Sequence, residues 1–312
     1  MAGDQLGVAV LGPGGVGGLV AALLSRGGAA VCVLAGGSTA HAIDHSGIRV
    51  ESARFGDFTA AVRTAERLEV PVDAVFIAVK STHLTAALER LPAGALGDAV
   101  IIPLLNGFEH MSLLRSLYPR DSVVAGTMRV ESTRLEAGLI RQTSPFATVE
   151  LAPSAASRER IERLGAALAA TGLDVRLRDD ESAMLWDKFA MLGPLALLTT
   201  HERANVGVVR TRRREDAVAV IAEVAAVAKA EGAAIDPAKI VKMLDSIPET
   251  METSMQKDQA HGRPLELDAL GGALIRRAAA AHVAVPVTSR LVKELEARTA
   301  ARPAREPGTV EP

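Results

Sequence analysis

A glycine-rich segment that directly follows a short apolar run restricts the possible folds more than any other part of this sequence. The run Leu6–Leu11 (LGVAVL) has the pattern of a buried parallel strand. The residues that follow match G-x-G-x-x-G and are Gly12, Pro13, Gly14, Gly15, Val16 and Gly17. In this pattern the first glycine allows a tight turn, the second lets the backbone approach a pyrophosphate, and the third lets the next helix pack on the strand. The segment therefore predicts dinucleotide binding, with a plain strand-to-helix turn as the alternative.

Further apolar runs predict the rest of the fold. Strands are expected at residues 30–34, 74–79 and 99–105, separated by helical patterns, which is typical of an α/β Rossmann-type doubly wound sheet. Beyond about residue 180 the pattern is helical almost throughout, although Gly193–Pro194 should kink or interrupt one helix. We expect an NADP-binding Rossmann domain over residues 1–178, a helical domain over 179–302 and a flexible tail over 303–312.

The end of the second predicted strand bears on the choice of nicotinamide cofactor. An acidic residue usually stands there in NAD-binding proteins, where it binds the ribose hydroxyls. Here the segment Leu34–Ser38 (LAGGS) has no carboxylate, and it has no arginine that could bind a 2′-phosphate. Because an acid would repel that phosphate, its absence favours NADPH over NADH.

Charge and composition exclude several classes of partner. The formal net charge of −2 gives no basic surface for nucleic acid or for anionic membranes. The single cysteine, Cys32, excludes an internal disulfide and fits a reducing compartment. The start of the chain lacks the pattern of an export signal, and no apolar stretch is long enough to span a bilayer. We therefore predict a cytoplasmic protein that binds no nucleic acid and no membrane. His41 and His45 have helical spacing but no third ligand in view, so we also predict no metal.

Two segments of the second half carry polar side chains in an apolar setting. Lys188 lies among Met184, Leu185 and Phe189, where partial desolvation would bring its ammonium group toward a pKa useful for proton transfer. The alternative is a lysine whose apolar stem packs while its charge reaches water. Farther on, residues 253–258 and 262–268 form two polar helix starts joined by a Gly-Arg-Pro turn.

Taken together, these segments resemble the ketopantoate reductase family. The resemblance spans nearly the whole chain, and its specificity comes from the order and spacing of several motifs. These are GPGGVG at 12–17, AVK at 78–80, NG at 106–107, WDK at 186–188, TSMQKD at 253–258, GRPLELD at 262–268 and VAVP at 283–286. It implies a Rossmann domain followed by an all-α domain similar to the C-terminal domain of 6-phosphogluconate dehydrogenase, serving for substrate binding and dimerisation.

The resemblance also implies a role for individual residues. Lys188 stands where the family keeps its general acid, and Glu266 matches the glutamate that binds the substrate hydroxyl, helps to orient the lysine and lies at the cofactor. Asn106 matches an asparagine at the junction of cofactor and substrate, and Ser254 matches the serine that contacts the substrate carboxylate. Lys80 matches a cofactor-side lysine, although an ordinary surface lysine at a strand end is the alternative.

The same resemblance implies NADPH-dependent reduction of a 2-oxo acid to a 2-hydroxy acid, with 2-dehydropantoate (ketopantoate) and pantoate as the first expectation, as in pantothenate biosynthesis. It also suggests a homodimer. Three positions that carry asparagine in the family are Leu192, Ala196 and Met251 here. Because these side chains offer no polar partner to a substrate, a more apolar ketone is an open alternative. A catalytically inactive NADP-binding protein is a further one.

Overall fold

The computed structural model describes residues 5–300, and the chain divides after Lys188 into two compact units. We call residues up to Lys188 unit 1 and residues from Phe189 onward unit 2. The predicted tail at residues 303–312 lies outside the described residues. The predicted division between residues 178 and 179 falls just before helix α6 (Glu181–Glu202), whereas the compact units divide inside that helix. The extent of the two functional domains stays a prediction.

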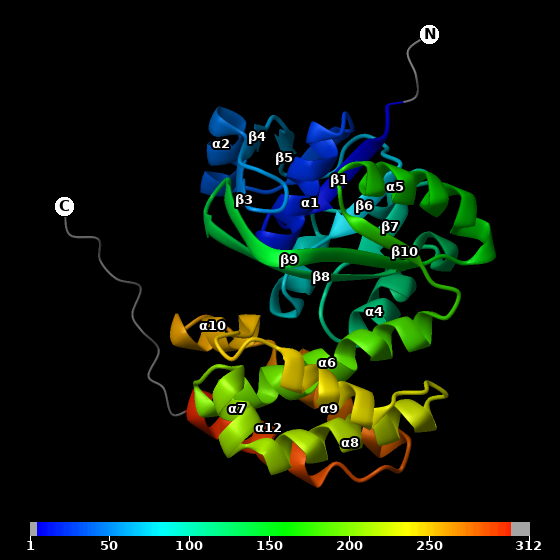
Figure 1. Ribbon diagram of the computed structural model, residues 1–312. Coiled ribbons are helices and arrows are strands. Elements are labelled where there is room, and N and C mark those ends of the chain that lie inside the picture. Colours follow the sequence, from blue (N-terminus) through cyan, green and yellow to red (C-terminus); the bar gives the residue numbers. More distant parts are fainter. Residues whose placement is uncertain (1–4, 301–312) are drawn as a thin grey trace, which may run out of the picture. The chain divides into compact units, whose positions relative to one another are not determined.

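The centre of unit 1 is a parallel five-stranded sheet, which we call sheet A (Figure 1). Its strands, in spatial order, are β5 (Arg63–Ala65), β2 (Ala30–Leu34), β1 (Gly7–Leu11), β6 (Ala74–Ile77) and β7 (Val100–Pro103). The four strands that the apolar runs predict are all present. Because the order changes direction on either side of β1, this is the doubly wound arrangement, and the predicted Rossmann-type fold is confirmed.

Helices cover both faces of sheet A. One face packs on α1 (Gly15–Arg26) and α5 (Arg158–Ala170), with buried Val10, Leu23 and Leu164 in a common core. The opposite face packs on α3 (Leu84–Leu88) and α4 (Glu109–Leu117). Helix α2 (Gly37–Ser46) follows β2. Because apolar side chains cover both faces, the strands of sheet A are near-continuous apolar runs.

A second sheet of unit 1, sheet B, is not predicted by the apolar runs. Its strands are β10 (Asp174–Leu177), β9 (Leu139–Ala152), β3 (Ile48–Ser52) and β4 (Phe58–Ala60), with β8 (Ala125–Glu136) paired to β9. Strands β8 and β9 form a long antiparallel hairpin around Gly138, whose φ of 79° requires a residue without a side chain. Helix α1 shares one core with both sheets. Figure 1 shows the hairpin as the longest pair of strands in the molecule.

All regular elements of unit 2 within the described residues are helices, as the sequence predicts (Figure 1). After α6 they are α7 (Val206–Arg212), α8 (Arg214–Ala230), α9 (Pro237–Ser246), α10 (Ser254–Ala260), a π-helical turn at Asp268–Gly272, α11 (Ala273–Ala280) and α12 (Pro286–Ala300). Helix α6 continues through Pro194, so the expected interruption at Gly193–Pro194 does not occur. The residues that follow it, Leu195 to Leu198, are buried and pack this part of α6. No helix within residues 5–300 is long and apolar enough to cross a membrane.

Candidate functional site

The carboxyl edge of sheet A brings four sequence-predicted segments to one side of unit 1. Since all five strands are parallel, the segments that follow them lie along the same edge. The glycine-rich segment follows β1, Lys80 follows β6, and Asn106 follows β7. The segment at Ala35–Gly37 follows β2 on the other side of β1. In an open α/β sheet this edge, at the point where the strand order reverses, is the usual place for a ligand.

The structure of the glycine-rich segment shows why glycine is required at several of its positions. Gly12 has a φ of 93°, and a Cβ atom built on it would lie 2.5 Å from Val79 Cγ1. A Cβ atom on Gly17 would lie 2.2 Å from the Gly12 carbonyl oxygen, so α1 packs against β1 at a distance that only glycine allows. Gly15 is equally constrained by β8, because a Cβ atom built on it would lie 2.1 Å from the Ser132 carbonyl oxygen.

Gly14 differs from these neighbours because the space beside it is open. A Cβ atom built there would meet only the Ala78 carbonyl oxygen, at 4.0 Å. Gly14 is also the N-cap of α1, whose first turn has no acidic residue and no side-chain cap. Unpaired N–H groups at a helix start attract anions. The residues present therefore fit the pyrophosphate of a dinucleotide, which could approach the backbone at Gly14.

Within unit 1, the loop that carries Asn106 lies against the first turns of α6. The rings of Phe108 and Trp186 are 4.5 Å apart between centroids and tilted by 47°. In the first turn of α4, the buried side chain of His110 interacts electrostatically with Lys188. The structure thus brings the Asn106 loop and Lys188 into one neighbourhood, where both side chains are half-buried.

His110 is a residue of this neighbourhood that the sequence did not single out. Its side chain is 6% exposed, and its Nε2 atom has no hydrogen-bond partner. Burial, together with the positive charge of Lys188, lowers the pKa of His110 to about 3. The imidazole is therefore neutral at ordinary pH and adds no positive charge beside the lysine. Its position four residues after Asn106, on a helix, is the only signal that could have pointed to it.

A chain of ion pairs fixes the start of α6 to sheet B. Arg178 donates hydrogen bonds to Glu150 at 2.7 Å and to Asp187 at 2.8 Å, and Arg129 also pairs with Glu150. Burial alone would raise the pKa of Glu150, but Arg129 and Arg178 outweigh it and hold that pKa below its usual value. Because Asp187 directly precedes Lys188, this network restrains the turn of α6 that presents the lysine.

The other sequence-predicted residues lie in unit 2. Ser254 is exposed and begins α10, whose N-cap Thr253 accepts a hydrogen bond of 3.3 Å from the Gln256 backbone N–H. Glu266 is 7% exposed and follows the predicted turn, where Arg263 donates a hydrogen bond of 2.8 Å to Asp258. At the three positions without asparagine, Ala196 is 1% exposed, whereas Leu192 and Met251 are half-buried.

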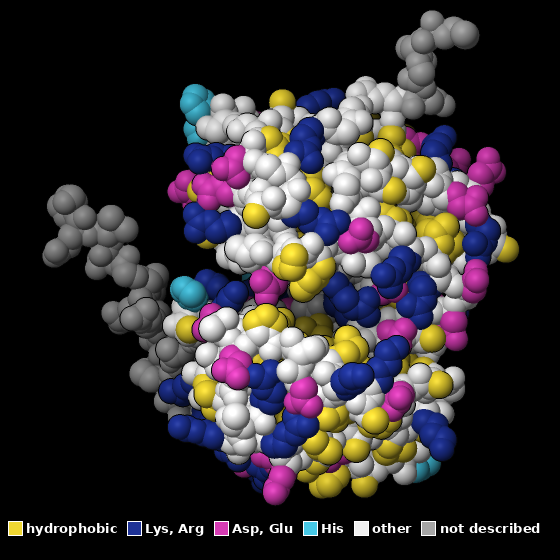
Figure 2. All heavy atoms as spheres, viewed as in Figure 1, with side chains coloured by type: hydrophobic (Ala, Val, Ile, Leu, Met, Phe, Trp, Pro, Cys, Tyr) yellow, Lys and Arg dark blue, Asp and Glu magenta, His cyan; other side chains and the backbone are white. Residues whose placement is uncertain are grey.

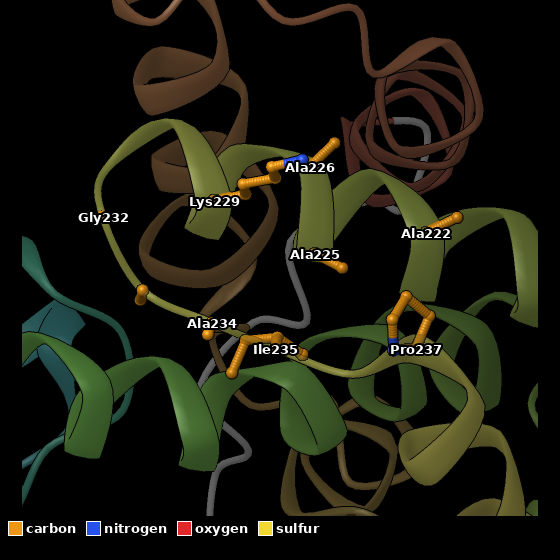
Figure 3. Close-up of a pocket in the computed structure, with 9 residues that line it drawn as sticks. Ala222, Ala225, Ala226, Lys229, Gly232, Ala234, Ile235 and Pro237 are labelled. Carbon is orange, nitrogen blue, oxygen red and sulfur yellow. The ribbon is translucent and has the colours of Figure 1, made fainter.

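A separate pocket in unit 2 contains none of these residues. It has a volume of about 460 Å³ and is formed by α8 and the segment that leads to α9 (Figure 3). Its lining is apolar except for one lysine and consists of Ala222, Ala225, Ala226, Lys229, Gly232, Ala233, Ala234, Ile235 and Pro237. With Lys229 as its one charged lining residue, it lacks the several convergent polar groups that would orient a 2-oxo acid.

The charges of the surface are mixed. On the face shown in Figure 2, basic and acidic side chains are interspersed, and neither kind covers the surface alone. Three arginines near residues 210–214 are paired with acidic side chains. Arg210 pairs with Glu249, Arg213 with Glu202 and Arg214 with Asp245. Within residues 5–300, no three His, Cys, Asp or Glu side chains are grouped as metal ligands would be.

Comparison with known proteins agrees with these two units. Residues 8–155 match the family model "Ketopantoate reductase PanE/ApbA", and residues 181–299 match "Ketopantoate reductase PanE/ApbA C terminal". A 2-dehydropantoate 2-reductase of Mycobacterium tuberculosis is 30% identical over 299 residues, which cover 93% of this chain and 97% of that protein.

Two solved structures extend the comparison. A 2-dehydropantoate 2-reductase of Geobacter metallireducens superimposes with a TM-score of 0.86 and 27% identity, covering 94% of this chain and 100% of that one. A D-mandelate dehydrogenase, solved with NADH and anilino(oxo)acetate, has a TM-score of 0.87 at 20% identity, over 95% and 99% of the two chains. The predicted resemblance is confirmed, and this chain belongs to the ketopantoate reductase family of oxidoreductases.

Proposed function

We propose that this protein uses NADPH to reduce a 2-oxo acid to a 2-hydroxy acid, with 2-dehydropantoate as the first candidate substrate. The observation that carries the proposal is the neighbourhood of Lys188 and the Asn106 loop in a unit that also holds an open glycine-rich segment. Family membership across both units supports it, because the relatives from M. tuberculosis and G. metallireducens are 2-dehydropantoate 2-reductases.

In the proposed reaction, Gly12, Pro13, Gly14, Gly15, Val16 and Gly17 bind the pyrophosphate, with Lys80 on the cofactor side. The cofactor, when bound, supplies a hydride to the carbonyl carbon. Lys188 gives a proton to the carbonyl oxygen, which receives the electron pair of the broken π bond. An ammonium group stabilises that oxygen most when its negative charge is greatest, and so lowers the barrier.

The remaining roles follow the family. Asn106 lies at both cofactor and substrate, Ser254 binds the substrate carboxylate, and Glu266 binds the substrate hydroxyl, orients Lys188 and contacts the cofactor. His110 has no role taken from the family; it is neutral at ordinary pH and so adds no second positive charge beside Lys188. We further propose that residues 1–178 bind the cofactor and that residues 179–302 bind the substrate and form a homodimer.

A second candidate substrate is a more apolar 2-oxo acid. Leu192, Ala196 and Met251 offer no hydrogen bond to a polar substrate, and each buried polar group left unpaired costs about 1–3 kcal/mol. D-mandelate dehydrogenase has the same fold and was solved with anilino(oxo)acetate, so the fold can hold an aryl compound. An NADP-binding protein without catalysis is the third possibility.

One assay separates the three. The oxidation of NADPH is followed by absorbance with 2-dehydropantoate and with aliphatic and aromatic 2-oxo acids. The proposal expects the highest kcat/KM for 2-dehydropantoate. A preference for a bulky apolar acid would select the second candidate, and tight NADPH binding without turnover of any acid would select the third.

The role of Lys188 is tested by Lys188→Ala, with Lys242→Ala on the exposed face of α9 as the matched control. We expect kcat to fall by about 100-fold or more, because general acid catalysis contributes about 10²- to 10⁴-fold. The dissociation constant for NADPH should stay within about twofold of the wild-type value. An unchanged kcat in Lys188→Ala would remove the lysine from the mechanism.

A further inference from the structure

An arginine from a distant part of the chain lies at the end of β2. The sequence around Leu34–Ser38 has neither an acid nor an arginine, yet the guanidinium group of Arg90 packs directly on Gly36. A Cβ atom built on Gly36 would lie 2.7 Å from Nη2 and 3.1 Å from Nη1 of Arg90. A side chain at Gly36 would displace the guanidinium, the flexible end of Arg90, from this position.

Backbone contacts hold Arg90 in place. It follows α3, and its carbonyl oxygen accepts a hydrogen bond of 2.9 Å from the Leu68 N–H. Its Nη1 atom donates a hydrogen bond of 2.7 Å to the carbonyl oxygen of Glu66. The residue before Glu66, Ala65, accepts a hydrogen bond of 3.0 Å from the Ala35 N–H at the end of β2. The guanidinium is therefore tied to the strand end through β5.

This position suits an anionic group on a ribose. The acceptor at Glu66 is a neutral carbonyl oxygen, so the positive charge of Arg90 is not cancelled by that bond. The first turn of α2 contains no acidic residue, and a Cβ atom on Gly37 would have no atom within 4 Å. In Rossmann folds the end of this strand faces the adenosine ribose of the dinucleotide, where an arginine accommodates a 2′-phosphate. A guanidinium can bind a phosphate through two parallel hydrogen bonds.

We propose that Arg90 binds the 2′-phosphate of NADPH and makes this protein prefer NADPH over NADH. The inference rests on the proposed function and adds to it a residue that sets the cofactor preference. The alternative for the same geometry is that the guanidinium plane stacks on the adenine. Because NADH has the same adenine, stacking would favour both cofactors equally.

The test measures dissociation constants for NADPH, NADH, 2′,5′-ADP and 5′-AMP by calorimetry, with the full-length protein and without substrate. For Arg90→Gln we expect NADPH and 2′,5′-ADP to bind about 10- to 100-fold more weakly, as the loss of a charge-assisted pair predicts. Binding of NADH and 5′-AMP should change by less than about twofold. Arg90→Lys, which keeps the charge but loses the two-pronged geometry, should fall between.

Gly36→Asp tests the contact between Arg90 and Gly36 from the side of the glycine. The φ of −136° at Gly36 is accessible to any residue, and a carboxylate there would pair with Arg90 and repel a phosphate. We expect this variant to lose its preference for NADPH. Arg120→Gln, an exposed arginine elsewhere in unit 1, is the matched control and should bind all four ligands as the wild type does.

The outcomes separate this inference from the proposed function. A wild-type preference for NADPH that survives in Arg90→Gln would overturn the assignment of Arg90 and leave the proposed function intact. Equal weakening of NADPH and NADH would show adenine stacking and overturn it as well. A wild-type protein that binds neither NADPH nor NADH would overturn both. If Arg90→Gln does not fold, the wild-type ratio of 2′,5′-ADP to 5′-AMP affinity and the Arg90→Lys variant decide the question.

Discussion

A single buried imidazole, that of His110, makes the stability of unit 1 depend on pH. Burial and the neighbouring Lys188 lower the pKa of His110 to about 3, whereas an unfolded chain has a histidine pKa near 6.5. Between these values the unfolded state binds a proton that the folded state does not. The contribution of this group to the free energy of unfolding is therefore fully present above pH 6.5, and it is lost as the pH falls toward 3.

His110→Gln should weaken this pH dependence. At pH 5 the unfolded imidazole is mostly protonated, and this lowers the free energy of unfolding of the wild type by about 2 kcal/mol. The substitution removes this contribution. Urea denaturation at pH 7.5 and pH 5.0 measures the loss of stability. We expect the loss to be smaller in His110→Gln than in the wild type, and unchanged in His41→Gln, which is exposed on α2. Equal losses in all three proteins would contradict the buried neutral state of His110.

At the scale of elements, one carboxylate connects two helices of unit 2. The alanine- and valine-rich pattern of α8 suggests that Glu223 points to solvent, but it is 9% exposed. Its oxygens accept hydrogen bonds from the Val287 N–H at 2.7 Å, the Thr288 N–H at 2.9 Å and the Thr288 hydroxyl at 2.6 Å. Glu223 thus caps the start of α12 from a different helix.

Glu223→Ala should destabilise unit 2 by about 1–3 kcal/mol, because it leaves buried N–H groups of α12 without an acceptor. Glu223→Gln keeps one acceptor oxygen and should cost less. Thermal and urea unfolding measure the effect, with Glu296→Ala on the exposed face of α12 as the control. A midpoint for Glu223→Ala equal to that of the control would mean that these bonds contribute no net stability.

The β8–β9 hairpin is the longest of several elements that the apolar runs do not predict. It alternates buried and exposed residues over much of β9, and Gly138 marks its turn, so a local signal exists. The signal is weakened by Pro145 inside β9 and by register shifts at Val130/Ser132 and Arg134/Glu136. Strand β10 has no comparable apolar run and is identified only by its pairing with β9.

At the scale of the whole molecule, two compact units share one continuous helix, α6, and divide inside it after Lys188. The glycine-rich segment and Arg90 both belong to unit 1. A ligand that binds only the folded state stabilises it in proportion to the logarithm of its free concentration. Nucleotide binding should therefore stabilise the unit that carries these residues.

NADPH at about 100 times its dissociation constant should raise the free energy of unfolding by about 2.7 kcal/mol. Differential scanning calorimetry measures the shift, and hydrogen exchange locates it, with the strongest protection expected in β1, α1 and the end of β2. The same concentration of 5′-AMP should stabilise less. A transition temperature that does not move at saturating NADPH would contradict cofactor binding by unit 1.

The amino-acid sequence by itself determined four of the five strands of sheet A, the tight turn at Gly12 and the helical character of unit 2. These features are local, because they depend on runs of apolar residues and on backbone angles that glycine alone adopts easily. Only the tertiary structure decided that Arg90 lies on Gly36, that His110 is buried beside Lys188, and that Glu223 caps α12. Each of these contacts joins residues far apart in the chain, so it depends on how the elements pack, which no local pattern specifies.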